Sequence, residues 1–215
     1  MIPKTIHQVF WNFKGKEIEE IPAYKSSIEK TKKFCQDYNY EYNMWGLKQC
    51  EELLCDKYPQ YIELWKEFRY SIQQCDFIRY LILHDKGGWY VDCDAYPLQD
   101  LKPLSNCSEV FSQFHDDKKK IPCNAQMGSV PNNSLWMTIC DDIEKRVIEK
   151  QNMKIYDTWK GRLIFQTTGH RMLKANVPDT SIYDLLIVHN DAKNISTKSL
   201  NPYFYEGCVS IWYDF

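Results

Sequence analysis

The feature that most constrains the fold is a long amphipathic pattern that runs into two glycines and a short apolar stretch. Between residues 61 and 84, apolar side chains recur every three or four residues, which is the spacing of one helix face. Gly87 and Gly88 provide a stop for this helix. The following WYVD, at residues 89–92, is typical of a buried strand. The pattern therefore predicts one continuous helix over 61–84 that leads directly into a strand.

Strand and helix patterns alternate along the rest of the chain. Further strands are predicted over residues 2–11, 39–45, 109–114, 124–130, 181–189 and 208–215. Further helices are predicted over residues 21–38, 47–59 and 131–150. This alternation predicts an α/β fold with a mostly parallel central sheet flanked by helices. We find no repeat and no convincing linker, so residues 1–215 are expected to form a single domain.

Charge and cysteine usage limit the function classes. A formal net charge of -2 argues against a nucleic-acid-binding protein, which would be clearly basic. No run of about 18 apolar residues is present, so no membrane span is expected, and no signal peptide is visible. The nine cysteines are odd in number and contain no C-x-x-C pair, which favours free thiols in a reducing compartment. We therefore expect a cytoplasmic protein.

Two aspartates, Asp92 and Asp94, follow the WYV strand pattern and are separated by one residue. With 16 aspartates in the chain, about one D-x-D is expected by chance, so the pair alone is weak evidence. The pair could lie in a solvated turn or accept backbone hydrogen bonds. However, ligands of open α/β sheets bind at the carboxyl ends of strands. Two close carboxylates there would suit a hard cation such as Mg²⁺ or Mn²⁺.

A second charged pair, Asp76 and Arg79, lies one turn apart on or beside the apolar face of the predicted helix. Burying such a pair is costly. One interpretation is a buried structural ion pair. The other is a polar pair exposed at the floor of a cleft, where a guanidinium and a carboxylate could bind sugar hydroxyls. The pattern alone leaves both open.

Two segments together resemble a known family. IPKTIHQVFW, at residues 2–11, and CDFIRYLILHDKGGWYVDCDAYPLQDLKPL, at residues 75–104, contain most of the ordered pattern of the family 32 glycosyltransferases. The sugar-binding region of the large clostridial glucosylating toxins is similar, with the same sixteen-residue step that separates Asp76 from Asp92 here. The resemblance implies a GT-A fold, a Rossmann-like sheet that binds a nucleoside diphosphate sugar with a divalent metal.

The resemblance also implies roles for individual residues. Asp94 would be the direct metal ligand, and Asp92 would contact the ribose, the donor sugar or metal-bound water. Asp76 and Arg79 would bind hydroxyls of the donor sugar. Four other residues complete the expected donor site: Val9 and Phe10 would border the nucleobase, and Asn124 and Gln126 would lie near the donor sugar. TTGH, at residues 167–170, resembles a stretch that lines the acceptor side, with His170 where the family has proline.

The C-terminal segment EGCVSIWYDF departs most from the family pattern, because it lacks a nearby histidine. The resemblance implies that Ser210 touches the metal and that Trp212 contacts the β-phosphate. Glu206 or Asp214 could supply a further oxygen ligand. His189 is a distant substitute for the missing histidine, and a strand-end histidine is the favoured interpretation of it.

The expected function is metal-dependent hexosyl transfer with retention of anomeric configuration, using Mn²⁺ or Mg²⁺. The donor would be a UDP-sugar by preference or GDP-mannose, and the acceptor a hydroxyl of a glycan or of a protein-linked or lipid-linked group, as in polysaccharide biosynthesis. Residues 1–104 would bind the nucleotide sugar and the metal, and residues 105–215 would complete the donor and acceptor sites. Two alternatives stay open: a non-catalytic sugar-nucleotide or glycan-binding module, and a haloacid-dehalogenase-type phosphatase, which also has a strand ending in D-x-D.

Overall fold

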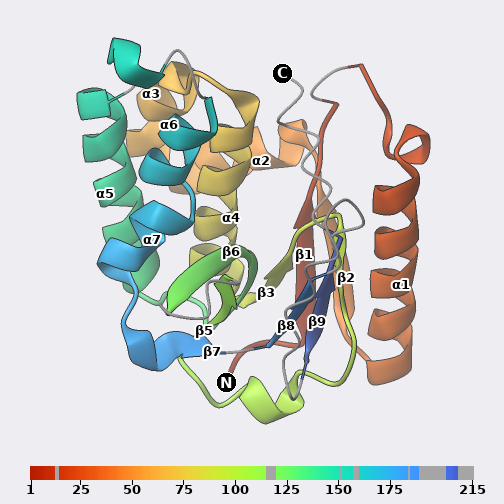
Figure 1. The fold of residues 1–215 in the computed structure, drawn as a ribbon. Coiled ribbons are helices and arrows are strands. Elements are labelled where there is room, and N and C mark those ends of the chain that lie inside the picture. Colours follow the sequence, from red (N-terminus) through yellow and green to blue (C-terminus); the bar gives the residue numbers. More distant parts are fainter. Residues whose placement is uncertain are drawn as a thin grey trace.

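A six-stranded sheet forms the centre of the computed structural model, which describes residues 1–12, 15–114, 120–150, 152–156, 160–183, 185–188 and 202–207 (Figure 1). Its strands are β1 (Thr5–Val9), β2 (Glu41–Trp45), β3 (Gly88–Val91), β5 (Glu109–Phe114), β6 (Ile121–Ser129) and β7 (Ile182–Tyr183). They lie in the order β2-β1-β3-β6-β5-β7. The neighbours β2-β1, β1-β3 and β5-β7 are parallel, and β6 is antiparallel to both of its neighbours.

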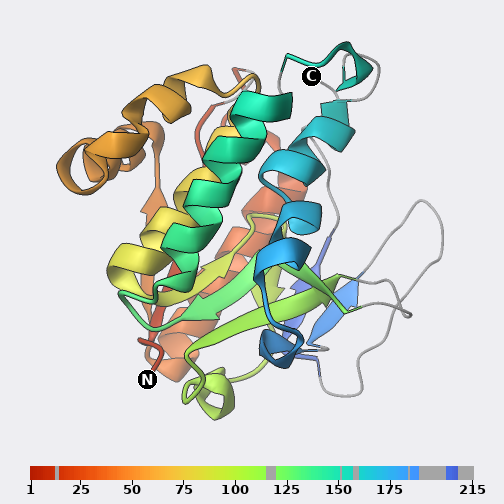
Figure 2. The same cartoon turned by 90° about the vertical axis from the view of Figure 1, so that its left-hand side faces the viewer.

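Helices cover both faces of this sheet. The α-helices are α1 (Pro22–Tyr38), α2 (Leu47–Lys57), α3 (Ile62–Glu67), α4 (Ser71–Lys86), α5 (Leu135–Lys150), α6 (Lys160–Thr167) and α7 (His170–Asn176). Figure 1 shows α1 on one side of the sheet and α4, α5, α6 and α7 on the other; Figure 2 gives the second side in full view. The α/β fold with a mostly parallel sheet flanked by helices is thereby confirmed.

A second, three-stranded sheet lies beside the first. It consists of β4 (Ala95–Pro97), β9 (Phe204–Glu206) and β8 (Leu186–Val188), in that order. β4 is antiparallel to β9, and β8 is parallel to β9. β4 begins directly after Asp94, so this small sheet fixes the aspartate turn to a segment more than 100 residues later in the chain.

The core is centred on α4, whose residues from Phe77 to Leu83 are all buried. The Tyr80 ring stacks on Trp136 of α5, with 5.9 Å between ring centroids, and Phe111 of β5 packs on the same tryptophan. Burial of aromatic side chains of this size contributes a large part of the hydrophobic stabilisation of a core. Helix α4 has the sheet on one side and α5 on another. The polar residues of α4, Asp76 and Arg79, are therefore buried as well.

The prediction of one helix over residues 61–84 is wrong. The structure has two helices, α3 and α4, separated by residues 68–70. Phe68 is extended, with φ -59° and ψ 125°, and its side chain is buried. It packs on Phe77, with ring centroids 5.4 Å apart. The break therefore places Phe68 in the core. At the start of α4, the side-chain oxygen of Gln73 accepts the N–H of Tyr70 at 3.1 Å and so caps the helix.

The single strand predicted over 181–189 is also wrong, because β7 and β8 lie in different sheets. β4 and β9 have three residues each, too few for a periodic pattern to reveal them. The strand predicted over 208–215 lies outside the described residues. No helix in the described part of the chain is both long and apolar enough to cross a membrane.

Candidate active site

The candidate site lies where the parallel strands β1 and β3 end. Asp92 follows the last residue of β3, and the side-chain amide of Gln8, near the end of β1, donates to the backbone oxygen of Asp92 at 3.1 Å. Gln8 is held in turn by the Tyr42 hydroxyl, which donates to its side-chain oxygen at 2.9 Å. The polar residues therefore lie at the carboxyl ends of the strands, where the sequence predicted a ligand site.

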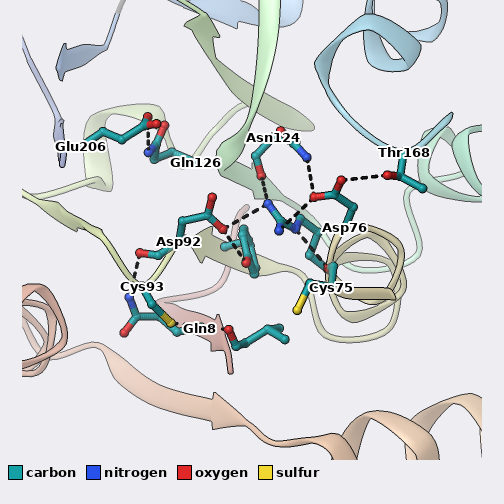
Figure 3. A network of polar contacts seen from close by, with 12 residues as sticks. Gln8, Cys75, Asp76, Asp92, Cys93, Asn124, Gln126, Thr168 and Glu206 are labelled. Atoms are coloured by element: carbon teal, nitrogen blue, oxygen red, sulfur yellow. Dashed lines mark hydrogen bonds and ion pairs between the residues drawn. The ribbon is translucent and has the colours of Figure 1, made fainter. Parts of the chain in front are cut away.

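Arg79 is the centre of a polar cluster that reaches this edge. Figure 3 shows its partners Asp76, Asp92 and Asn124 close together. Its Nη2 lies 3.0 Å from Oδ1 of Asp76, and its Nη1 lies 3.1 Å from Oδ1 of Asp92. Nη1 also donates to the backbone oxygen of Asn124 at 2.8 Å, and Nε donates to that of Cys75 at 3.1 Å. The planar guanidinium can satisfy these acceptors together because its donors point in several fixed directions.

Asp76 is held at both of its carboxylate oxygens. Besides the Arg79 contact, Oδ1 accepts the side-chain amide of Asn124 at 2.9 Å, and Oδ2 accepts the Thr168 hydroxyl at 2.8 Å. Burial raises the pKa of Asp76 to about 6, although Arg79, Thr168 and Asn124 favour the charged form. These three partners thus oppose the effect of burial and favour the ionised carboxylate.

Of the two interpretations of Asp76 and Arg79 that the sequence leaves open, the structure agrees with the buried ion pair and not with a pair exposed at the floor of a cleft. The exposed fraction is 4% for Asp76 and 3% for Arg79, whereas the Asp92 side chain is 30% exposed. Asp76 and Arg79 form a buried ion pair, and Asp92, which also contacts Arg79, is the outer member of the three-residue cluster. The reason is the packing of α4 between the sheet and the helices α5 to α7, which the sequence pattern did not reveal.

The outer member, Asp92, uses one carboxylate oxygen within this cluster. Tyr90 donates its hydroxyl to Oδ1 of Asp92 at 2.7 Å, and the contact with Arg79 falls on the same oxygen. The Tyr90 ring also lies 4.5 Å from the guanidinium carbon of Arg79 and packs against that cation. Tyr90 was not singled out in the sequence, because it reads as an ordinary core residue of a buried strand.

The second aspartate, Asp94, lies in the turn between β3 and β4 and is half-buried. Its backbone oxygen accepts the N–H of Gly207 at 2.9 Å, so the end of β9 lies over the turn. Between the aspartates, the Cys93 thiol donates to the backbone oxygen of Val9 at 3.4 Å. Burial first, and then the charge of Asp94, keep the pKa of the Tyr24 phenol well above its usual range.

The residues of this turn fit a hard divalent cation by chemistry, because Asp92 and Asp94 offer carboxylate oxygens at one strand end. Within the described ranges, however, no group of three or more histidine, cysteine, aspartate or glutamate residues is arranged to hold a metal. Ser210, the expected third contact, lies outside the described residues, as do Trp212, Asp214 and His189. Their assigned roles stay predictions.

Asn124 and Gln126, both on β6, are separated in the structure. Asn124 belongs to the Asp76 and Arg79 cluster. Gln126 is buried in a second cluster, in which it donates to Glu206 at 3.0 Å and accepts the Ser112 hydroxyl at 2.8 Å. This second cluster brings Glu206 to the same edge of the sheet as the aspartate turn, as Figure 3 shows.

Comparisons with known proteins identify part of the chain. Residues 22–127 match the family model described as the glycosyltransferase sugar-binding region containing a DXD motif. This segment includes Asp76, Arg79, Asp92, Asp94 and Asn124. The chain carries a glycosyltransferase sugar-binding region.

Curated relatives are similar over much of the same sequence. The chain is 32% identical over 143 residues to a mannosyl phosphorylinositol ceramide synthase of Saccharomyces cerevisiae, covering 64% of this chain and 33% of the relative. It is 30% identical over 147 residues to an inositol phosphoceramide mannosyltransferase of Schizosaccharomyces pombe, covering 67% and 39%. The chain thus spans about a third of the length of these relatives. A glycosyltransferase of Acanthamoeba polyphaga mimivirus is 25% identical over 208 residues, covering 94% and 74%.

The fold is also similar to a solved structure, the PaToxG glycosyltransferase. The TM-score is 0.55 at 16% sequence identity, over 81% of this chain and 68% of that one. At this identity the likeness concerns the fold. It agrees with the α/β fold that the sequence predicts.

The residues expected at the nucleobase of the sugar-binding region are Val9 and Phe10, and both are buried. The Phe10 ring packs edge-on against Tyr24, with centroids 6.0 Å apart. Trp11, one residue later, is only partly buried, and its ring centroid lies 6.1 Å from that of Trp65. Trp11 is therefore the more accessible aromatic ring at the end of β1.

Proposed function

We propose that this chain is the catalytic domain of a metal-dependent, retaining glycosyltransferase that moves a hexose from a nucleoside diphosphate sugar to an acceptor hydroxyl. The observation that carries the proposal is the cluster of Asp76, Arg79, Asp92 and Asn124 at the carboxyl ends of β1 and β3. The match of the DXD family model to the same residues supports it.

The residues of the cluster have complementary tasks in this proposal. Arg79 is held by Asp76 and fixes Asp92, which is the most exposed member of the ion-pair cluster. Because the contacts with Arg79 and Tyr90 both fall on Oδ1 of Asp92, its Oδ2 would be the oxygen that contacts a ligand. Asn124, which is only partly buried, would bind a hydroxyl of the donor sugar, and the buried pair Asp76 and Arg79 would orient Asn124 and Asp92 for that contact.

Asp92 and Asp94 would hold Mn²⁺ or Mg²⁺, together with Ser210 and a further oxygen such as that of Glu206. A divalent cation held there would supply positive charge to neutralise the departing diphosphate. Trp11, at the end of β1, would line the nucleobase site beside Val9 and Phe10. Retention would follow from attack of the acceptor hydroxyl on the same face from which the phosphate departs.

The donor and the acceptor are finer parts of the proposal. A UDP-sugar is the slightly preferred donor, and GDP-mannose is the alternative; the names of the yeast relatives support mannose as the transferred sugar. Those names, which refer to inositol phosphoceramide, also support a lipid-linked acceptor hydroxyl. We further propose a cytoplasmic location, because the eight described cysteines are all free thiols.

A thermal-shift panel with UDP-glucose, UDP-galactose, UDP-N-acetylglucosamine and GDP-mannose, each with and without Mn²⁺, tests the proposal. A ligand that binds only the folded state raises the melting temperature, so one donor with Mn²⁺ should stand out. The same mixture should then release the free sugar slowly by hydrolysis. Binding without hydrolysis or transfer would favour the non-catalytic module, and no binding to any of the four would contradict the proposal. A stable beryllium fluoride adduct would favour the phosphatase.

A further inference from the structure

Helix α4 is joined to the last residue of α6, Thr167, and to Thr168 directly after it by three side chains of one helix face. Gln73 donates its side-chain amide to the Thr167 hydroxyl at 2.9 Å. Asp76, one turn later, accepts the Thr168 hydroxyl at 2.8 Å. Tyr80, a further turn along, donates its hydroxyl to the backbone oxygen of Thr168 at 2.6 Å. Residues at this spacing lie on one face of a helix. Residues 167 and 168 therefore contact α4 along two of its helical turns.

The Thr168 hydroxyl is placed to fix the orientation of the Asp76 carboxylate. It has one proton and two acceptors within reach: Oδ2 of Asp76 at 2.8 Å and the backbone oxygen of Ile164 at 3.3 Å. The carboxylate is closer and charged, and hydrogen bonds to charged groups are the stronger ones. Thr168 is fully buried, so bulk water is not available to replace this bond.

The position of Asp76 then determines that of Arg79. With Oδ2 held by Thr168, Oδ1 is directed at Nη2 of Arg79, whose Nη1 reaches Asp92. Loss of the Thr168 hydroxyl would leave a buried carboxylate oxygen without this donor, and burial already raises the pKa of Asp76. Figure 3 shows this line of contacts from Thr168 through Asp76 to Asp92.

We propose that Thr168 is a positioning residue for donor-sugar binding, which acts through Asp76 and Arg79. The inference rests on the proposed function and deepens it, since it adds a residue beyond the segment 22–127 that matches the sugar-binding family. It also connects the turn at 167–170, expected on the acceptor side, to the donor side of the site by a direct hydrogen bond.

The test compares Thr168→Val and Thr168→Ser with Thr167→Val. Valine keeps the shape and removes the hydroxyl, and serine keeps the hydroxyl. Thr167, the last residue of α6, is a matched control, because it is equally buried and adjacent in sequence, but its hydroxyl bonds with Gln73 and Leu163. Calorimetric titration with Mn²⁺ would use the best-binding nucleotide sugar of the four-donor panel and, separately, the corresponding nucleoside diphosphate.

Thr168→Val should weaken binding of the nucleotide sugar about tenfold, the effect of one lost charged hydrogen bond. Binding of the nucleoside diphosphate should change less than about twofold, because that part of the donor does not contact Asp76. Thr168→Ser and Thr167→Val should bind both ligands like the wild type. Should Thr168→Val fail to fold, Thr168→Ala is measured in its place.

Equal nucleotide-sugar affinities for Thr168→Val and the wild type would overturn the inference, as would an equal loss for sugar-bearing and sugar-free ligands. An equal loss in Thr167→Val would show a merely structural role of the turn and overturn it too. Failure of the proposed function looks different, because then the wild-type protein itself binds none of the four nucleotide sugars.

Discussion

Arg79 of α4 joins Asp76, on its own helix, to Asp92 at the end of β3, with nitrogen-to-oxygen distances of 3.0 and 3.1 Å. The relationship connects the helix that dominates the core to the strand end that carries the aspartate pair. A buried cation with two carboxylates is stable only while all three charges are present, because each one compensates the desolvation of the others.

The first prediction concerns the removal of this cation. Arg79→Ala should lower the free energy of unfolding by about 3–5 kcal/mol, because it leaves two carboxylates without their shared partner. Arg79→Lys should recover only part of the loss, since a single ammonium cannot reproduce the forked geometry. Urea unfolding monitored by circular dichroism measures both. Lys33→Ala, which breaks an exposed ion pair with Asp37, should cost no more than about 1 kcal/mol and serves as the control.

The second prediction concerns Asp94. Asp94→Ala should reduce Mn²⁺-dependent hydrolysis of the preferred nucleotide sugar at least about a hundredfold, because the electrostatic stabilisation of the departing diphosphate is lost. Its melting temperature without metal should stay close to that of the wild type, since Asp94 is only half-buried. Full activity of this variant would remove Asp94 from the metal site.

The third prediction concerns the pH dependence of stability through His7. Its ring lies between Trp45, whose Nε1 donates to Nδ1 at 3.2 Å, and the backbone oxygen of Gly87, 3.1 Å from Nε2. The ring is therefore neutral with its proton on Nε2, and burial lowers the pKa of His7 from 6.5 to about 4. Because the unfolded chain binds this proton more readily, the stabilisation is complete above pH 6.5 and is lost as the pH falls toward 4.

Between pH 7.5 and pH 5, protonation of His7 in the unfolded chain should lower the free energy of unfolding by about 2 kcal/mol. His7→Gln should show a smaller decrease in the free energy of unfolding over the same interval, because glutamine does not titrate. Urea unfolding curves at the two pH values measure the difference. Identical decreases in the variant and the wild type would show that His7 is not neutral in the folded protein.

The fourth prediction concerns Gly88, the second glycine before the aspartate strand. Its φ is +85°, and a Cβ there would lie 2.8 Å from the backbone oxygen of Thr5 on β1. Gly88→Ala should therefore force β1 and β3 apart and destabilise the fold by about 3 kcal/mol or more. Gly15→Ala is a matched control: its φ is +71°, but a Cβ there meets nothing within 4 Å.

Gly15→Ala should lower the free energy of unfolding by only about 1 kcal/mol, the cost of placing a side chain on a left-handed backbone. Differential scanning calorimetry of the two variants measures the comparison. Equal losses would mean that the left-handed backbone, and not the approach of β1, is what requires glycine at position 88.

Much of the architecture could be predicted because its signals are local. The apolar, β-rich run of residues 2–11 predicted β1, and the alternating pattern of residues 39–45 predicted β2. The lysine-rich amphipathic pattern of residues 21–38 predicted α1. The break at Phe68 could not be predicted, because an apolar residue at helical spacing fits a continuous helix equally well. The contact of Phe68 with Phe77 across the break is visible only in the tertiary structure.

The candidate site divides in the same way. The order of Asp76, Arg79, Asp92 and Asp94 along the chain, and their placement on a helix face and at a strand end, follow from the sequence alone, because spacing within an element is a local property. The tertiary structure decided that the Asp76 and Arg79 pair is buried and that Thr168, 92 residues further along, completes it. Burial and partners depend on which distant segments pack together, and this depends on the free energy of the whole core.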